Sequence, residues 1–184
     1  MGLPLTIVPS GIDETQHQAG SAADYVKRLA EVKASAVAQR IKSGLVIGAD
    51  TVVVINDQIL EKPRDESEAQ DMLTSLSGRW HQVLTGVCLI RAETGNRKSG
   101  CEVTRVRFTS MRPDEVQWYV ATGEPMDKAG AYAIQGYGAL FIERIEGDYL
   151  NVVGLPLRLV YRLATGLGVD LKKDMSRAGG EESA

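Results

Sequence analysis

The sequence is poor in cysteine and has no long apolar run, and each shortage excludes a class of protein. Only two cysteines, Cys88 and Cys101, occur in 184 residues, and they lack the spacing of a metal site. We therefore expect reduced thiols rather than a disulfide framework. No apolar stretch approaches the ~18 residues of a membrane span, and no signal peptide opens the chain. We expect a cytoplasmic protein without a membrane partner.

Positive charge and aromatic residues are also scarce. Lysine and arginine total 21 against 24 aspartates and glutamates, for a net charge of −3. A large nucleic-acid surface normally makes a domain basic, and the tryptophans and tyrosines are too scattered for a base-stacking platform, so we expect no nucleic-acid partner. The Walker A loop, the G-x-S-x-G elbow and the H-E-x-x-H helix are absent as well. A small anionic ligand remains compatible, because it needs only a local cluster of cations.

The pattern of helices and strands indicates one α/β domain. Apolar content of 43% and charged content of 24% are ordinary for a soluble globular chain. Helical and alternating segments follow one another, which predicts a mixed β-sheet with flanking helices and a central cleft. The expected domain is 1–170, and the tail 171–184 has too little apolar content to pack. The expected helices are 22–43, 67–76, 112–122 and 156–166, and the expected strands are 45–55, 81–91, 100–109, 140–145 and 150–153.

One carboxylate, Asp50, interrupts the β-branched run at 46–54, with the hydroxyl of Thr51 beside it. Such a run predicts a buried strand. Burying a lone charge is costly unless it is paired or binds a metal. Asp50 could instead sit at a strand kink and bond to backbone amides. We favour a chemical role.

A second group of polar residues lies at 123–138, a segment expected to be a loop or a broken helix. It holds Glu124, Asp127, Lys128, Gln135 and four glycines. Carboxylates bind Mg²⁺, an ammonium binds phosphate oxygens, and glycines let backbone approach a ligand closely. The alternative is a solvated loop with a local ion pair between Asp127 and Lys128. For the cluster as a whole we favour a metal–phosphate site.

Five further polar residues carry little signal alone. Lys33, Lys62 and Glu14 lie in segments where a charged side chain is usually just solvated. His17 and His81 have no partner pattern, and His81 is expected to be structural or solvent-facing. None of the five would be assigned a role from local sequence.

Five longer motifs carry a family resemblance. They are GADTVV at 48–53, EKP at 61–63, LSGRWHQVLTGV at 76–87, YVATGEPMDKAGAY at 119–132 and NVVGLPL at 151–157. In order and spacing the sequence resembles the Maf proteins over residues 2–168. These are nucleoside triphosphate pyrophosphatases related in fold to the inosine triphosphate pyrophosphatases. The resemblance implies hydrolysis between the α and β phosphates with a divalent metal, and a homodimer.

Carried over by position, the resemblance implies that Asp50 accepts the proton of the attacking water or binds the metal. Glu14, Lys33 and Lys62 match polar residues of the family's cleft. Two carboxylates ~4 Å apart repel by roughly 1–4 kcal/mol. A divalent cation, Mg²⁺ or Mn²⁺, would offset that repulsion and lower the pKa of bound water.

Thr51 and Gln135 match positions associated with substrate choice in the branch similar to dTTP/UTP pyrophosphatases, so the expected partner is a nucleoside triphosphate. The residues expected to bind substrate are Lys33, Lys62, Thr51, Lys128 and Gln135. The residues expected to bind metal are Glu14, Asp50, Glu124 and Asp127.

The sequence departs from the family pattern at its start. The family opens with a strand and a Ser-x-Ser-Pro-Arg-Arg loop, which would offer amides and arginines to the triphosphate, and neither is present here. Either Met1 is an internal methionine of a longer chain, which we favour because the later motifs are complete, or this is a short homologue with weak or no activity. The alternative function is therefore a nucleotide-binding regulatory protein that has lost turnover.

Overall fold

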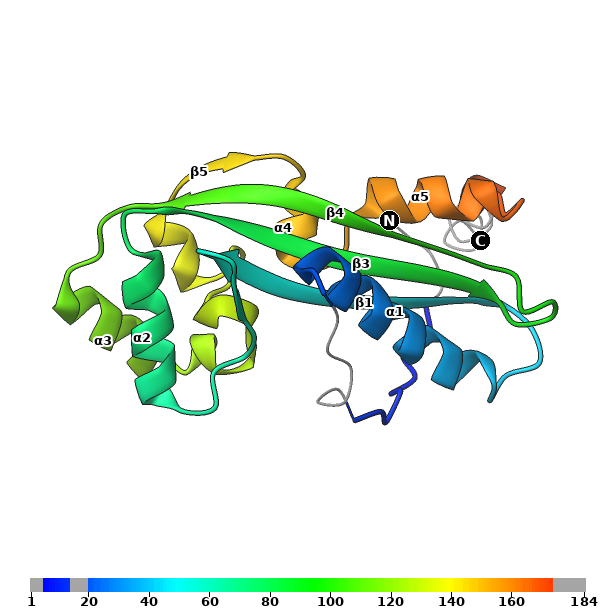
Figure 1. Cartoon of the computed structure of the whole chain (residues 1–184), viewed down its shortest axis with the longest axis horizontal. Helices are drawn as coiled ribbons and strands as arrows, with labels where there is room; N and C mark the ends of the chain where they lie inside the picture. The colour runs from blue at the N-terminus through cyan, green and yellow to red at the C-terminus, as the bar shows by residue number, and fades with distance from the viewer. Residues whose placement is uncertain (1–4, 14–19, 174–184) are drawn as a thin grey trace, which may run out of the picture.

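The computed structural model describes residues 5–13 and 20–173, which form a five-stranded sheet with helices on both faces (Figure 1). The strand order is β2-β1-β3-β4-β5. The strands are β1 Leu45–Ile55, β2 Gln58–Leu60, β3 Trp80–Arg91, β4 Arg97–Phe108 and β5 Ile142–Glu146. The α-helices are α1 Ala22–Ala38, α2 Glu66–Leu76, α3 Pro113–Ala121, α4 Tyr149–Val153 and α5 Leu157–Gly166. The expected α/β class with flanking helices is confirmed.

All strand pairs in the described residues are antiparallel, which corrects the expected mixed sheet. β1 and β2 form a hairpin whose turn residues Asn56 and Asp57 have φ values of 50° and 62°. Positive φ at both central positions gives the backbone twist that a two-residue hairpin requires. β3 and β4 form a second, long hairpin. The other two neighbouring pairs, β1 with β3 and β4 with β5, are separated in sequence by helices and are antiparallel as well.

Helix α1 packs directly on the backbone of β1 and β3, and two glycines make that approach possible. A Cβ added at Gly86 would lie 2.2 Å from the carbonyl oxygen of Val26, and one added at Gly48 would lie 2.4 Å from that of Ala30. Any side chain at either glycine would collide with the helix backbone. This close packing sets the position of the α1 side chains above the middle of β1.

The two sheet faces carry different helices. In Figure 1, α1 and α5 lie on opposite sides of the sheet, and α2 and α3 lie together at one end. Helix α5 packs Leu159 and Leu163 against Val87 and Leu89 of β3. None of the helices in the described part of the chain is long and apolar enough to cross a membrane.

Two segments differ from expectation in the last third of the chain. The segment 150–153, expected as a strand, lies in α4, because the Asp148 side chain accepts the Leu150 N–H at 2.8 Å and Gly154, at φ 113°, ends the helix. Leu171, in the expected tail, is buried against the α5 cluster, whereas 174–184 lie outside the described residues. The segment 123–138, expected as a loop or broken helix, contains short 3₁₀ turns.

His81 lies in the core, one of the two placements expected for it, with 3% of its surface exposed. Its Nε2 is 2.8 Å from the hydroxyl of Tyr132, and both rings meet Phe108 edge to face. Burial lowers the pKa of His81 to about 4 and raises that of Tyr132. The folded protein therefore holds His81 neutral well below the pH at which a free histidine gains a proton.

We expect this histidine to make stability pH-dependent. Between its ordinary pKa of 6.5 and its folded pKa of about 4, the unfolded chain binds a proton that the folded chain does not. Stability is thus complete above pH 6.5 and falls as the pH falls, by about 3 kcal/mol at pH 4. Urea unfolding of the wild type and of His81→Gln, at several pH values, isolates the contribution of His81 to the free energy of unfolding. Parallel stability curves for the two proteins would show that His81 is not held neutral.

Candidate functional site

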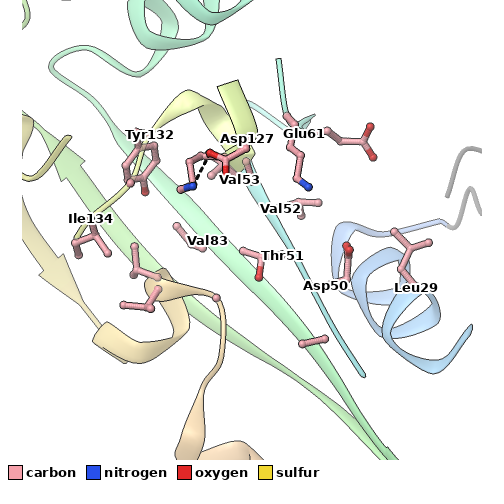
Figure 2. A pocket seen from close by; sticks show the side chains of 18 of the residues that line it. Leu29, Asp50, Thr51, Val52, Val53, Glu61, Val83, Asp127, Tyr132 and Ile134 are labelled. Carbon is pink, nitrogen blue, oxygen red and sulfur yellow. Dashed lines mark hydrogen bonds and ion pairs between the residues drawn. The ribbon is translucent and has the colours of Figure 1, made fainter. Parts of the chain in front are cut away.

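A pocket of about 480 Å³ opens over the middle of β1 (Figure 2). β2 pairs only with Val53–Ile55, so the outer edge of β1 before Val53 has no strand partner among the described residues. Because residues from both faces of β1 line the pocket, it wraps around this edge. Its walls come from α1, β1, the segment after β2, residues 127–135 and the end of α4.

The alternation of β1 places Asp50 and Thr51 on opposite faces. Even-numbered β1 residues such as Val52 pack against α1, and odd-numbered ones such as Ala49 pack on the α5 side. In Figure 2, Asp50 lies beside α1, Tyr132 lies at the far end of the pocket, and Thr51 lies between them. The pocket therefore has a charged end near α1 and a more apolar end beyond Thr51.

The ion pair of Lys33 and Asp50 defines the charged end. Lys33 Nζ donates to Asp50 Oδ1 at 2.6 Å, and the two side chains are 21% and 10% exposed. An acid buried to this degree needs a cation nearby. The pairing links α1 to β1 and keeps the Asp50 carboxylate at the pocket wall.

Two more lysines and two more carboxylates face the same pocket. Glu61 and Lys62 follow β2, and the Tyr25 hydroxyl of α1 donates to Glu61. Asp127 and Lys128 form the ion pair considered above, and the Lys128 ammonium holds the pKa of Asp127 below its usual range. Asp127 is exposed, and exposed pairs contribute little to stability. Both residues can therefore exchange this contact for one with a ligand.

Glu124 lies outside the pocket lining, where it organises the 123–138 segment. Its carboxylate accepts from the Tyr119 hydroxyl at 2.7 Å and from the backbone N–H groups of Tyr137 and Gly138 at 2.8 and 3.0 Å. Burial raises the pKa of Glu124, but the hydrogen bonds from Gly138, Tyr119 and Tyr137 together lower it by more. The pKa is therefore below its usual value. The structure thus leaves Glu124 outside the pocket lining that contains Asp50 and Asp127.

Of the remaining expected site residues, Gln135 and Thr51 line the pocket. Gln135 is exposed and lines the apolar end of the pocket, and Thr51 lies within hydrogen-bonding distance of Thr85. Glu14 lies outside the described residues. Sequence reasoning missed Glu61, although it precedes Lys62 in the same short motif and lines the pocket beside it.

The arrangement suits an elongated ligand with anionic and apolar ends. Lys33, Lys62 and Lys128 can meet phosphate oxygens, while the pocket beyond Thr51 is lined by Tyr132, Ile134 and aliphatic residues of α4. The described residues include no group of three His, Cys, Asp or Glu that could hold a metal by themselves. Mg²⁺ usually takes one or two carboxylates and completes its shell with waters and phosphate oxygens, so the carboxylates at this end are compatible with such an ion.

Comparison with known proteins agrees with this geometry. Residues 1–167 match the family model described as Maf-like protein. Relatives named dTTP/UTP pyrophosphatase include those of Symbiobacterium thermophilum, 49% identical over 91% of this chain and 86% of the relative, and Moorella thermoacetica, 50% identical over 93% and 88%. A third, from Geobacillus sp. strain WCH70, is 51% identical over 90% and 88%. A match over this length, with the quoted motifs meeting at one pocket, shows that the chain belongs to the Maf family.

Proposed function

We propose that this protein is a nucleoside triphosphate pyrophosphatase that hydrolyses dTTP and UTP between the α and β phosphates. The observation that carries the proposal is the Lys33–Asp50 pair at the charged end of a pocket whose other end is apolar. Relatives about half identical in sequence are named dTTP/UTP pyrophosphatase. The cytoplasm remains the expected location, and the homodimer remains a prediction.

In the proposed reaction, water attacks the α-phosphorus and the bond to the oxygen bridging the α and β phosphates breaks. Asp50 accepts the proton of the attacking water, as a positioned general base. Lys33, Lys62 and Lys128 stabilise the charge on the phosphate oxygens, and these charge-assisted contacts work best in a partly dry pocket. The products are a nucleoside monophosphate and pyrophosphate.

A divalent cation, Mg²⁺ or Mn²⁺, is proposed as the cofactor. Asp50 and Asp127 would hold it together with the triphosphate, because both side chains line the pocket. When bound, the ion would neutralise phosphate charge and acidify a bound water. Glu14 remains a candidate ligand. Glu124 is not part of the proposed set, because Tyr119, Tyr137 and Gly138 already donate to its oxygens.

The apolar end of the pocket is proposed to take the base. Tyr132 and Ile134 offer an apolar surface there, and Gln135 and Thr51 offer polar groups to the edge of a ring. A mostly apolar wall with a few placed polar groups is the usual design of a small-molecule site. The base would then lie next to Thr51, and the phosphates would extend toward Lys33 and Lys62.

The product distinguishes this proposal from others. With Mg²⁺ or Mn²⁺ present, the protein is expected to release one pyrophosphate per dTTP or UTP, and chelation of the metal by EDTA is expected to stop the release. Separate assays for pyrophosphate and orthophosphate, with GTP and CTP as comparison substrates, make the measurement. Release of orthophosphate alone would overturn the reaction. Tight dTTP binding without turnover would instead indicate the regulatory alternative.

A further inference from the structure

The hydroxyl of Thr51 belongs to a chain of hydrogen bonds that runs from the pocket into the core. Thr51 Oγ1 and Thr85 Oγ1 are 2.9 Å apart, on directly paired residues of β1 and β3. Thr85 Oγ1 in turn donates to the backbone carbonyl of Asn151, in α4, at 3.2 Å. Thr85 and Asn151 are fully buried, whereas Thr51 lines the pocket. Figure 2 places Thr51 on β1 between Asp50 and Tyr132.

The proton positions in this chain follow from counting donors. Each threonine hydroxyl has a single proton to give. If Thr85 gives its proton to the carbonyl of Asn151, it must accept from Thr51, and both contacts are then hydrogen bonds. If Thr85 instead gives its proton to Thr51, only one bond forms. A buried hydroxyl has no water to replace a missing bond, so the first arrangement is lower in free energy.

Asn151 is held by hydrogen bonds at both its side-chain nitrogen and its backbone carbonyl, so the acceptor for Thr85 cannot move easily. Its side-chain Nδ2 donates to the carbonyl of Val83 at 2.9 Å and to Thr104 Oγ1 at 3.0 Å. Its own carbonyl also accepts the N–H of Gly154 at 3.0 Å. The side-chain amide must present its NH₂ to Val83, because a carbonyl oxygen can only accept. The backbone carbonyl of Asn151 can likewise only accept, so this buried carbonyl sets the direction of the Thr85 and Thr51 protons.

We propose that Thr85 and Asn151 are positioning residues that hold Thr51 as a hydrogen-bond acceptor toward the pocket, and that this selects a base with an N–H donor. The proposal rests on the proposed function. Thymine and uracil have a protonated ring nitrogen, N3–H, whereas cytosine has an unprotonated acceptor at the same place. With its proton directed at Thr85, the Thr51 oxygen can accept the N3–H of thymine or uracil. Opposite cytosine, its lone pair would face the lone pair of N3, and the two would repel.

The space around Thr51 permits this contact. Gly154 lies across from it, and a Cβ added there would lie 3.7 Å from Thr51 Oγ1, in van der Waals contact with the hydroxyl. The glycine therefore leaves the hydroxyl open to a ligand. Since Gly154 is also bonded to the Asn151 carbonyl, the same short segment shapes the pocket wall and directs the Thr51 proton.

Thr85→Val tests the proposal, because valine has the shape of threonine without the hydroxyl. In this variant the Thr51 proton is released and can turn toward cytosine N3. The ratio of kcat/KM for UTP to that for CTP is expected to fall roughly five- to tenfold, the effect of one oriented hydrogen bond. Thr85→Ser keeps the hydroxyl and should retain the wild-type ratio. Thr74→Val removes an exposed hydroxyl that donates to Gln70 in α2 and serves as the matched control.

Pyrophosphate release by the wild type tests the proposed function, and the UTP-to-CTP ratio of the variants tests the role of Thr85. A wild type that releases no pyrophosphate contradicts the proposed function itself. If the wild type is active and a folded Thr85→Val keeps the UTP-to-CTP ratio, the proposed role of Thr85 is wrong. An equal loss of activity for both substrates also contradicts it, because a purely structural role predicts that result. If Thr85→Val does not fold, Thr85→Cys, with its weaker donor, must lower the ratio as well. An unchanged ratio in that variant overturns the inference.

Discussion

Replacing Asp50 with Asn is expected to lower kcat/KM for dTTP and UTP by roughly 10²–10⁴-fold, the usual effect of losing a general base. Asparagine keeps the shape of the side chain but cannot accept the water proton and binds a divalent cation poorly. Lys33 loses its charged partner at 2.6 Å, but part of its surface faces the pocket, so solvent can compensate. We therefore expect the fold to persist while turnover is lost.

Asp114→Asn provides the matched control for this change. Asp114 is 71% exposed and pairs with Arg112 at the start of α3, and it is not among the pocket residues. Its substitution should leave steady-state kinetics unchanged. Thermal melts of both variants separate lost chemistry from lost structure. Near-normal turnover in a folded Asp50→Asn protein would remove Asp50 from the mechanism.

Gly86→Ala is expected to cause the largest loss of stability. The added Cβ would lie 2.2 Å from the carbonyl oxygen of Val26 and 2.6 Å from the amide nitrogen of Lys27. Both are backbone atoms, so no side chain can rotate away, and α1 must move off the sheet. Overpacking of this kind costs about 1–3 kcal/mol or more. At the upper end, the melting temperature should fall by about 6–12 °C.

Gly100→Ala in β4 tests whether the effect depends on backbone contact. A Cβ there would lie 3.0 Å from Leu159 Cδ1, the flexible end of a side chain. We expect a smaller loss from Gly100→Ala in urea unfolding. Activity should also fall more in Gly86→Ala, because movement of α1 carries Lys33 away from Asp50. Equal losses at the two glycines would mean that the close approach of α1 is not what Gly86 provides.

Local patterns were enough to predict most elements and the central acid. The apolar run of β1 with a single carboxylate identified both the strand and Asp50, because burial makes a lone charge costly. Local sequence could not distinguish a mixed from an antiparallel sheet, since strand direction depends on which strands meet. The segment 150–153 was misassigned because three apolar residues around Asn151 suit either state, although Asp148 and Gly154 mark the ends of a helix.

The roles of Glu124 and Thr85 could not be predicted from local sequence, because they also depend on which segments meet in the fold. Glu124 looked like a ligand because acids and glycines surround it, but the folded segment turns its carboxylate toward Tyr119 and two backbone amides. Thr85 carried no signal because a threonine in a strand is ordinary. Its importance depends on a carbonyl in α4, 66 positions along the chain. Contacts between distant segments decide such roles, and no local motif reports them.

The pocket is built from two stretches of chain, 25–62 and 127–154, together with Val83 of β3. A fragment containing either stretch alone would hold half a site. Ligand affinity and global folding are consequently one linked equilibrium: a nucleotide at 100 times its dissociation constant adds about 2.7 kcal/mol to the free energy of unfolding. In a cell, the substrate itself would act as a folding ligand, so the population of intact protein would follow the size of the nucleotide pool.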